Sequence, residues 1–231
     1  MAEGRTNFAF MQVGTDPRAE LFVRSVRKTM PQAYIVQCSD ADSPEVPGID
    51  KLARHDGNAR NLMLFRLECF ARLTLNGPAV YLDSDMLMLR PIDLKAILGS
   101  ADAALCQRVF GRENLINPRC EIDVPEYDGK TFGQVWPFLG CFTVARSNRF
   151  WVRCRETVEG LPDKFKFWYG DQEALRIVSK SSEFRIGRLK ESDYACLPHF
   201  ADERRPPYLL HFKGRRQKDV MFGYARNLLG Q

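Results

Sequence analysis

Two short apolar segments, residues 8–13 and 33–38, enclose a stretch with helical character, and this order constrains the fold more than any other feature. Asp16 suits the N-cap of the intervening helix and Pro17 its first turn, while Pro31 ends it. A strand, a helix and a strand in close succession predict a parallel βαβ unit. The turn after the first strand then lies at the carboxyl edge of the sheet, where α/β folds bind ligands.

The same alternation continues along the chain. Further helices are predicted at residues 58–75, 92–98, 148–158 and 168–178, and further strands at 79–82, 101–107, 139–145 and 207–212. Residues 39–57 are rich in Asp, Pro and Ser and predict a loop, and residues 109–132 predict a long excursion suited to binding an acceptor. Because no repeat, low-complexity tract or linker interrupts the pattern, we expect one α/β domain over residues 1–231.

Composition sets outer limits on function. Hydrophobic residues make up 45% of the 231 positions and charged residues 27%, enough for a substantial core. The net charge of +5 suits phosphate-bearing ligands or an anionic surface, and is too small to indicate nucleic-acid binding. Seven scattered cysteines without C-x-x-C pairs argue against a disulfide framework or a zinc site and for a reducing compartment. With a polar N-terminus and no apolar run of bilayer length, we expect a soluble cytoplasmic protein.

Two carboxylates follow the apolar strand at 79–82, which Gly77 and Pro78 introduce. Carboxylates are rarely buried unless they are paired or bind a metal. Asp83 and Asp85 are two positions apart and point to the same side of an extended chain, so both can face one hard cation such as Mg²⁺ or Mn²⁺. The alternative is a solvated polar turn, and the apolar residues on both sides weaken it.

Arg66 falls within the apolar face of the helix predicted at 58–75, where it needs an anionic partner. That partner is either a carboxylate of the core or a phosphate of a ligand. Asp171 and Gln172 stand at the start of another predicted helix, where an N-cap with a polar neighbour is the simpler interpretation.

His211 ends the last predicted strand and precedes Gly214 and a basic segment at 213–218. The imidazole can complete a metal site begun by two carboxylates, or it is a structural residue. Glycine allows a close approach of backbone N–H groups to an anion, and Lys or Arg neutralises phosphate. Alternatively, this basic segment is only a solvated part of the protein surface and binds no ligand.

In this order the motifs resemble the GT-A-fold nucleotide-sugar glycosyltransferases, most closely the family 8 retaining enzymes, which include bacterial lipopolysaccharide galactosyl- and glucosyltransferases and glycogenin. The matching segments are residues 65–67, 80–87, 139–142, 169–172 and 210–214. Departures are also present. The family's Asn-Ala-Gly is absent near 140, and its phosphate-binding lysine position holds Gln217, with Lys218 next and Arg215 or Arg216 as substitutes.

The resemblance implies a single GT-A (Rossmann-like) α/β domain with a mixed, mainly parallel central sheet flanked by helices. It places a nucleotide-sugar half at about 8–107 and an acceptor-side half at about 108–231. It further implies that Asp83, Asp85 and His211 hold Mn²⁺ or Mg²⁺.

The resemblance also implies residues for the donor and for catalysis. Asp171 and Gln172 would be catalytic, beside the sugar. The donor, most simply a UDP-hexose, would be bound by Val13, Thr15, Arg66, Ser84, Gly214 and Lys218. The acceptor would be a glycan or a lipid-linked glycan, and the basic C-terminal segment suits peripheral contact with an anionic inner membrane face.

Two other functions compete. A sugar-nucleotide nucleotidyltransferase shares acidic metal ligands, but residues 13–17 lack the Gly-rich, Lys/Arg-bearing loop of those enzymes. A non-enzymatic basic protein that binds an anionic surface would use the charged and apolar residues of the C-terminal segment.

Overall fold

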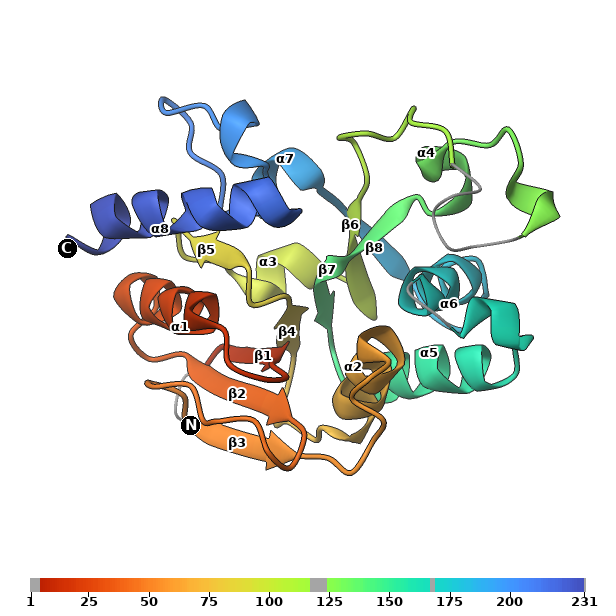
Figure 1. The fold of residues 1–231 in the computed structure, drawn as a ribbon, viewed down its shortest axis with the longest axis horizontal. Coiled ribbons are helices and arrows are strands. Elements are labelled where there is room, and N and C mark those ends of the chain that lie inside the picture. The colour runs from red at the N-terminus through yellow and green to blue at the C-terminus, as the bar shows by residue number, and fades with distance from the viewer. Residues whose placement is uncertain (1–4, 117–123, 167–168, 231) are drawn as a thin grey trace.

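The computed structural model describes residues 5–116, 124–166 and 169–230. A seven-stranded sheet in the order β3-β2-β1-β4-β7-β6-β8 forms its centre, and β5 pairs with β9 in a separate two-stranded sheet (Figure 1). The strands are β1 (Asn7–Met11), β2 (Tyr34–Ser39), β3 (Lys51–Arg54), β4 (Ala79–Leu82), β5 (Met86–Met88), β6 (Ala103–Gln107), β7 (Phe138–Ala145), β8 (Ile186–Lys190) and β9 (Leu209–His211). Among the described strands of the seven-stranded sheet, only β7 runs antiparallel to its neighbours, β4 and β6, so the predicted mixed, mainly parallel sheet is confirmed.

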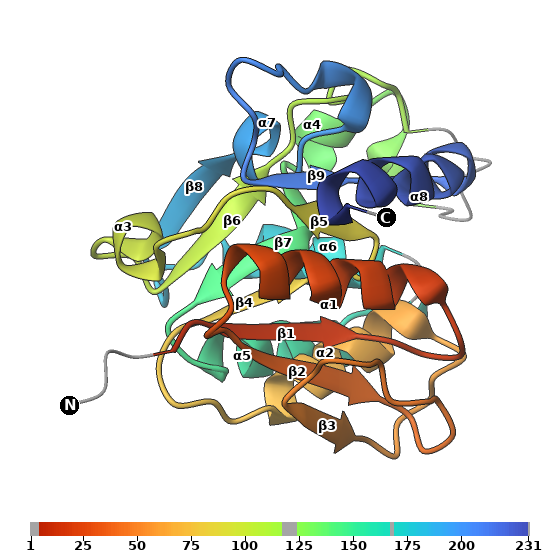
Figure 2. The same ribbon diagram turned by 90° about the vertical axis from the view of Figure 1, so that its left-hand side faces the viewer.

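Helices cover both faces of the sheet. They are α1 (Pro17–Thr29), α2 (Leu62–Arg72), α3 (Leu94–Leu98), α4 (Phe132–Val135), α5 (Arg149–Glu159), α6 (Gly170–Val178), α7 (Glu191–Tyr194) and α8 (Arg215–Leu229). Short 3₁₀ turns lie at Pro125–Tyr127, Asp163–Phe165 and Pro198–Phe200. The α1 helix lies on one face and α2 and α5 on the other, as the two views show (Figures 1 and 2).

Each face has its own apolar core. Beneath α1, Phe22 packs edge-on against Phe10 of β1, with ring centroids 5.2 Å apart. On the opposite face, Phe70 of α2, Tyr81 of β4 and Trp151 of α5 form a cluster with centroids 5.1 to 5.3 Å apart. Burial of both surfaces explains why β4 is apolar at every position, as expected of a strand with helices on both sides.

Several predicted boundaries were wrong. The loop predicted at 39–57 contains β3, whose four residues are all partly or fully exposed, so no apolar pattern marks this edge strand. The predicted helix at 58–75 begins only at Leu62, because the Asn61 side chain caps it by accepting a hydrogen bond from the Leu64 N–H. The strands β5 and β8 and the helix α8 were not predicted.

Strand pairing determines where the site forms. Since β7 is antiparallel to both β4 and β6, the carboxyl ends of β1, β4 and β6 meet the first residues of β7 at one edge. Strand β9 pairs with β5 so that His211 stands opposite Met86, one residue after Asp85. The last strand of the chain thereby reaches the segment that follows β4.

Two observations bear on the setting of the chain. In the part that the structure describes, none of the helices combines the length and the apolar character needed to cross a bilayer. The six cysteines within that part are all free thiols.

Candidate functional site

A cleft of about 760 Å³ opens at this edge of the sheet. Nine of the eleven residues predicted for the site line it: Val13, Arg66, Asp83, Ser84, Asp85, Asp171, Gln172, His211 and Gly214. Thr15 does not line the cleft and is exposed on the turn after β1. Lys218 lies in the first part of α8, and its side chain, like those of Arg215 and Arg216, is outside what the structure describes.

Asp83, Asp85 and His211 each offer one ligand atom, and these three atoms lie within 4.8 Å of one another. His211 Nε2 is 3.5 Å from Asp85 Oδ1. Backbone bonds hold both segments: the Asp83 N–H donates to Cys141 O at 3.1 Å, and the Phe212 N–H donates to Asp85 O at 2.9 Å. Two carboxylates and an imidazole are a donor set that Mn²⁺ and Mg²⁺ accept, so the residues present fit such an ion.

The His211 imidazole is 5% exposed and lies where positive charge is favoured. Burial alone would disfavour its charged form, but the neighbouring Cys141 and Asp85 outweigh burial and raise the pKa of His211 well above its usual value. The surroundings therefore stabilise a cation beside Asp85.

Arg66 joins two of the acids. Its Nη1 donates to Asp83 Oδ1 at 2.5 Å and its Nη2 to Asp171 Oδ2, and the arginine is almost fully buried. Of the two partners that the sequence left open for Arg66, the structure shows carboxylates. Both carboxylates line the cleft, so Arg66 fixes their positions, and its contact with a donor phosphate stays a prediction.

Gly140 of β7 leaves the space that this ion pair occupies. A Cβ atom at position 140 would lie 2.5 Å from both Arg66 Nη2 and Asp171 Oδ2, closer than non-bonded atoms approach. The absence of a side chain here is therefore a condition for the Arg66–Asp171 contact.

Asp171 and Gln172 stand in the first turn of α6, whose N-cap residue is Tyr169. The simpler interpretation of Asp171 as an N-cap was therefore wrong, and its carboxylate serves Arg66 instead. Gln172 Oε1 accepts a hydrogen bond from Arg108 Nη2 at 2.5 Å.

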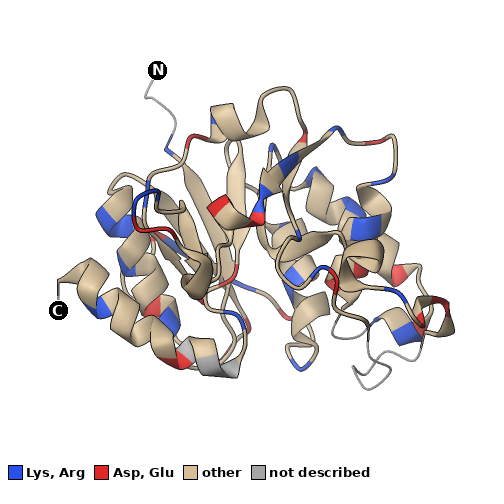
Figure 3. Cartoon of the chain, turned by 90° about the horizontal axis from the view of Figure 1, so that it is seen from above, with Lys and Arg blue, Asp and Glu red and all other residues tan. Residues whose placement is uncertain are grey.

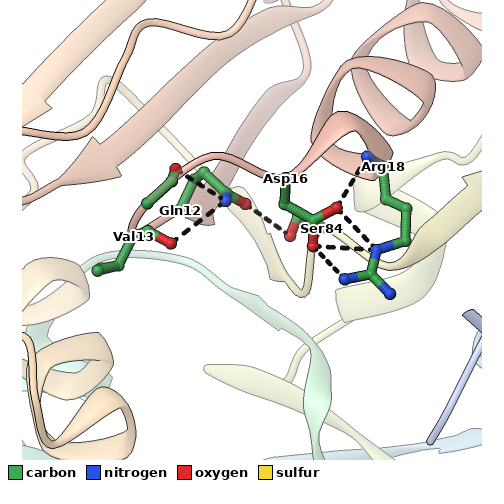
Figure 4. A network of polar contacts seen from close by, with 6 residues as sticks. Gln12, Val13, Asp16, Arg18 and Ser84 are labelled. Atoms are coloured by element: carbon green, nitrogen blue, oxygen red, sulfur yellow. Dashed lines mark hydrogen bonds and ion pairs between the residues drawn. The ribbon is translucent and has the colours of Figure 1, made fainter. Parts of the chain in front are cut away.

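The turn after β1 is tied to the acidic segment by Gln12 (Figure 4). The Ser84 hydroxyl donates to Gln12 Oε1 at 3.1 Å, and the Gln12 amide donates to the carbonyls of Val13 and Gly14 at 3.4 and 3.3 Å. Asp16 caps α1 by accepting from the Arg18 N–H at 3.0 Å, as predicted, and also pairs with the Arg18 guanidinium.

Among the polar residues of the cleft, sequence reasoning missed Gln12 and Arg108, and it singled out Lys213 only as part of the basic segment 213–218. Gln12 and Arg108 follow β1 and β6 directly, and Lys213 comes two residues after His211. The signal that found Asp83, a polar residue at the carboxyl end of a buried strand, also holds for Gln12 and Arg108. It was not applied to them because single polar residues after strands are common.

Charge is otherwise mixed over the molecule. Seen from above, basic and acidic positions alternate over the helices and loops, and the part of the chain drawn in colour presents no continuous basic stripe (Figure 3).

No protein-family model and no curated protein sequence matches the chain. Several solved structures, however, match its fold. The glycosyltransferase GlyE of Streptococcus pneumoniae TIGR4 superimposes with a TM-score of 0.63 at 14% identity over 99% of this chain. The chain spans 63% of the length of GlyE.

Two further structures agree. The galactosyltransferase LgtC, solved with donor and acceptor sugar analogues, gives a TM-score of 0.58 at 17% identity, covering 97% of this chain and 95% of LgtC. The bifunctional glycosyltransferase WbbM gives 0.59 at 14% identity, covering 97% of this chain and 50% of WbbM. The chain therefore has the fold of these glycosyltransferases, and the GT-A fold predicted from its motifs is confirmed.

Proposed function

We propose that the chain is a metal-dependent retaining glycosyltransferase that moves a hexose from a nucleotide diphosphate sugar, most simply a UDP-sugar, to a glycan or lipid-linked acceptor. One observation carries the proposal: Asp83, Asp85 and His211 converge on one cleft from segments far apart in sequence. They do so on a fold that the chain shares with glycosyltransferases.

Asp83, Asp85 and His211 would hold Mn²⁺ or Mg²⁺. When bound, the ion supplies Lewis acidity that stabilises negative charge on a leaving diphosphate. The backbone of Gly214, which has a φ of 82°, and the basic residue Lys218 would add donors for the same phosphates.

The remaining residues would orient the donor. Arg66 holds Asp83 and Asp171 in place through its two ion pairs. The turn around Val13 and Thr15 would receive the nucleobase and ribose, at the end of the cleft that Gln12 fixes.

Asp171 and Gln172 would lie beside the sugar. In a retaining reaction by front-face attack, the Gln172 carbonyl oxygen would stabilise the positive charge that develops on the sugar ring. That oxygen already accepts a hydrogen bond from Arg108, which restricts the rotation of the amide. The amide is thereby held in one orientation for the reaction.

The two halves of the chain would divide the substrates. Residues 8–107 would form most of the nucleotide-sugar half, and residues 108–231 would form the acceptor-side half while also contributing His211, Gly214 and Lys218 to the donor site. A lipid-linked acceptor at an anionic membrane surface would suit α8, which exposes the apolar side chains of Val220, Phe222 and Tyr224. A cytoplasmic location remains part of this proposal.

The test is an assay of UDP-sugars with an acceptor panel, read as UDP release and as the anomeric configuration of the product by NMR. We expect transfer that needs Mn²⁺ or Mg²⁺ and retains the donor's configuration. Release of UDP at full rate in excess chelator would contradict the metal role, and an inverted product would contradict the retaining mechanism.

A further inference from the structure

Arg108 is a nearly buried cation whose charge is not neutralised by an ion pair in the described part of the chain. It is 5% exposed and lines the cleft. Its Nε donates to the carbonyl of Trp136 at 2.9 Å, its Nη2 donates to Gln172, and its guanidinium lies 5.4 Å from the centre of the Phe132 ring. A carbonyl, an amide and a ring position a guanidinium, but none of them carries a negative charge.

The nearby carboxylate of Glu191 is already engaged. Its Oε2 accepts hydrogen bonds from the backbone N–H groups of Val109 and Phe110 at 2.5 and 2.7 Å. Glu191 therefore holds the segment after β6 in place without forming an ion pair with Arg108.

Lys213 is a second cation in the same cleft, and it too has no ion pair among the described residues. Arg108 and Lys213 therefore bring two positive charges to the lining of one cleft. The other arginines of the cleft differ, because Arg18 is paired with Asp16 and Arg66 with two carboxylates.

The place of Arg108 separates it from the nucleotide end. In the sheet order β1-β4-β7-β6, Arg108 follows β6, two strands from the Asp83 segment and three from Gln12. At a strand spacing of about 4.8 Å, Arg108 is roughly 10 Å from the acidic segment across the sheet, on the side away from the first turn. Arg108 also donates a hydrogen bond to Gln172, the residue proposed to lie beside the sugar.

We propose that Arg108 and Lys213 form an anion subsite that binds the carboxylate or phosphate of an acidic sugar substrate. This inference rests on the proposed function. A buried guanidinium without a direct ion pair is unfavourable, and an anionic group on the sugar would supply one through short, charge-assisted hydrogen bonds. Transfer would then favour an acidic sugar, on the donor or on the acceptor, over its neutral analogue.

The test measures binding affinity by calorimetry in the presence of Mn²⁺, with each sugar added separately so that no transfer occurs. The native chain is titrated with UDP, UDP-glucose and UDP-glucuronate, and then, in the presence of UDP, with a disaccharide ending in glucuronate or in glucose. We expect at least tenfold tighter binding of the acidic member in one of the two pairs, on the order expected for a charge-assisted hydrogen bond. The pair that responds identifies whether the donor or the acceptor carries the anion.

Arg108→Met should remove that preference and leave UDP binding unchanged. Because Arg108 is buried, the exposed Lys213→Met provides a second test, with a preference reduced severalfold. Arg90→Met is the matched control, since Arg90 stacks on Tyr208 outside the cleft and should retain the full preference.

Two outcomes would contradict the anion subsite, and a third would contradict the proposed function as well. Equal binding of acidic and neutral sugars, alongside Mn²⁺-dependent UDP binding, contradicts the anion subsite alone. Weakened binding of UDP itself in Arg108→Met would assign Arg108 to the diphosphate and also contradict it. If the native chain fails to bind UDP with Mn²⁺, the proposed function fails, and the inference fails with it.

Discussion

At the scale of single residues, the missing side chain of Gly140 leaves room for the Arg66–Asp171 ion pair in the cleft. Gly140→Ala would place a methyl group against Arg66 and Asp171, and we expect the ion pair to be displaced. The free energy of unfolding should fall by about 1–3 kcal/mol, as for other overpacked sites, and transfer should be largely lost.

The matched control is Gly223→Ala in α8, where a Cβ atom meets nothing within 4 Å. This change should leave transfer unaltered and raise stability by about 0.5–1 kcal/mol, because alanine favours a helix over glycine. Thermal or urea unfolding of both variants measures the difference. Equal stability of the two would show that the space at Gly140 is not restricted.

Asp85 and His211 allow a second prediction at this scale. Asp85→Asn keeps the shape of the side chain and removes its charge, so Mn²⁺ affinity and metal-dependent transfer should drop by about 100-fold or more while the fold remains intact. His211→Ala should weaken the Mn²⁺ titration in the same way. An unchanged titration in His211→Ala would return this histidine to a structural role.

At the scale of elements, Glu173 connects α6 to the segment before β7. Its carboxylate accepts hydrogen bonds from Tyr127 at 2.8 Å, from Trp136 at 3.1 Å and from Arg176. Burial favours the neutral acid, but these donors outweigh burial and lower the pKa of Glu173. The charged carboxylate therefore stabilises the packing of the 124–136 segment on α6.

The pH dependence follows from the direction of that shift. A carboxyl group whose pKa is lower in the folded than in the unfolded chain stabilises the fold above the unfolded pKa, and this stabilisation is lost as the pH falls through the folded value. Glu173→Gln should therefore cost about 1–3 kcal/mol near pH 7 and less near pH 4. Urea unfolding at several pH values measures this, with the exposed Glu203→Gln as control. A gap between native chain and Glu173→Gln that widens on acidification would contradict the assignment.

Elements with strong periodicity or clear stop signals were predictable. The helix that Asp16 caps and the strand before Asp83 agree with the structure to within one residue. Strand β3 was not predictable, because at a sheet edge its backbone pairing with β2 is decisive and its side chains are exposed. Helix α2 was predicted too long, because Asn61 determines its start within a run of helix-compatible residues.

The residues of the candidate site also fall into those that the sequence predicted and those that it did not. Asp83, Asp85 and His211 were found because their type and order resemble a known motif, and the structure brings their ligand atoms together. Arg108 was not found, and Lys213 was noted only within the basic segment 213–218, because the role of each depends on which carboxylates are already engaged. That is a property of packing between distant segments, as with Glu191 and the backbone after β6.

At the scale of the whole molecule, the parallel strands bring their carboxyl ends to one edge, and the β5–β9 pair carries His211 to that edge. The chain thus forms one cleft from segments that span most of its length. A ligand that fills this cleft contacts elements from both halves and should raise the melting temperature of the whole fold.

The metal site is therefore best tested by calorimetric titration of the native chain with UDP, with and without Mn²⁺, repeated on Asp85→Asn. We expect tight binding only for the native chain with Mn²⁺, and at least about tenfold weaker binding in each of the other three cases. Equal UDP affinity in all four would contradict a metal site formed by Asp83, Asp85 and His211.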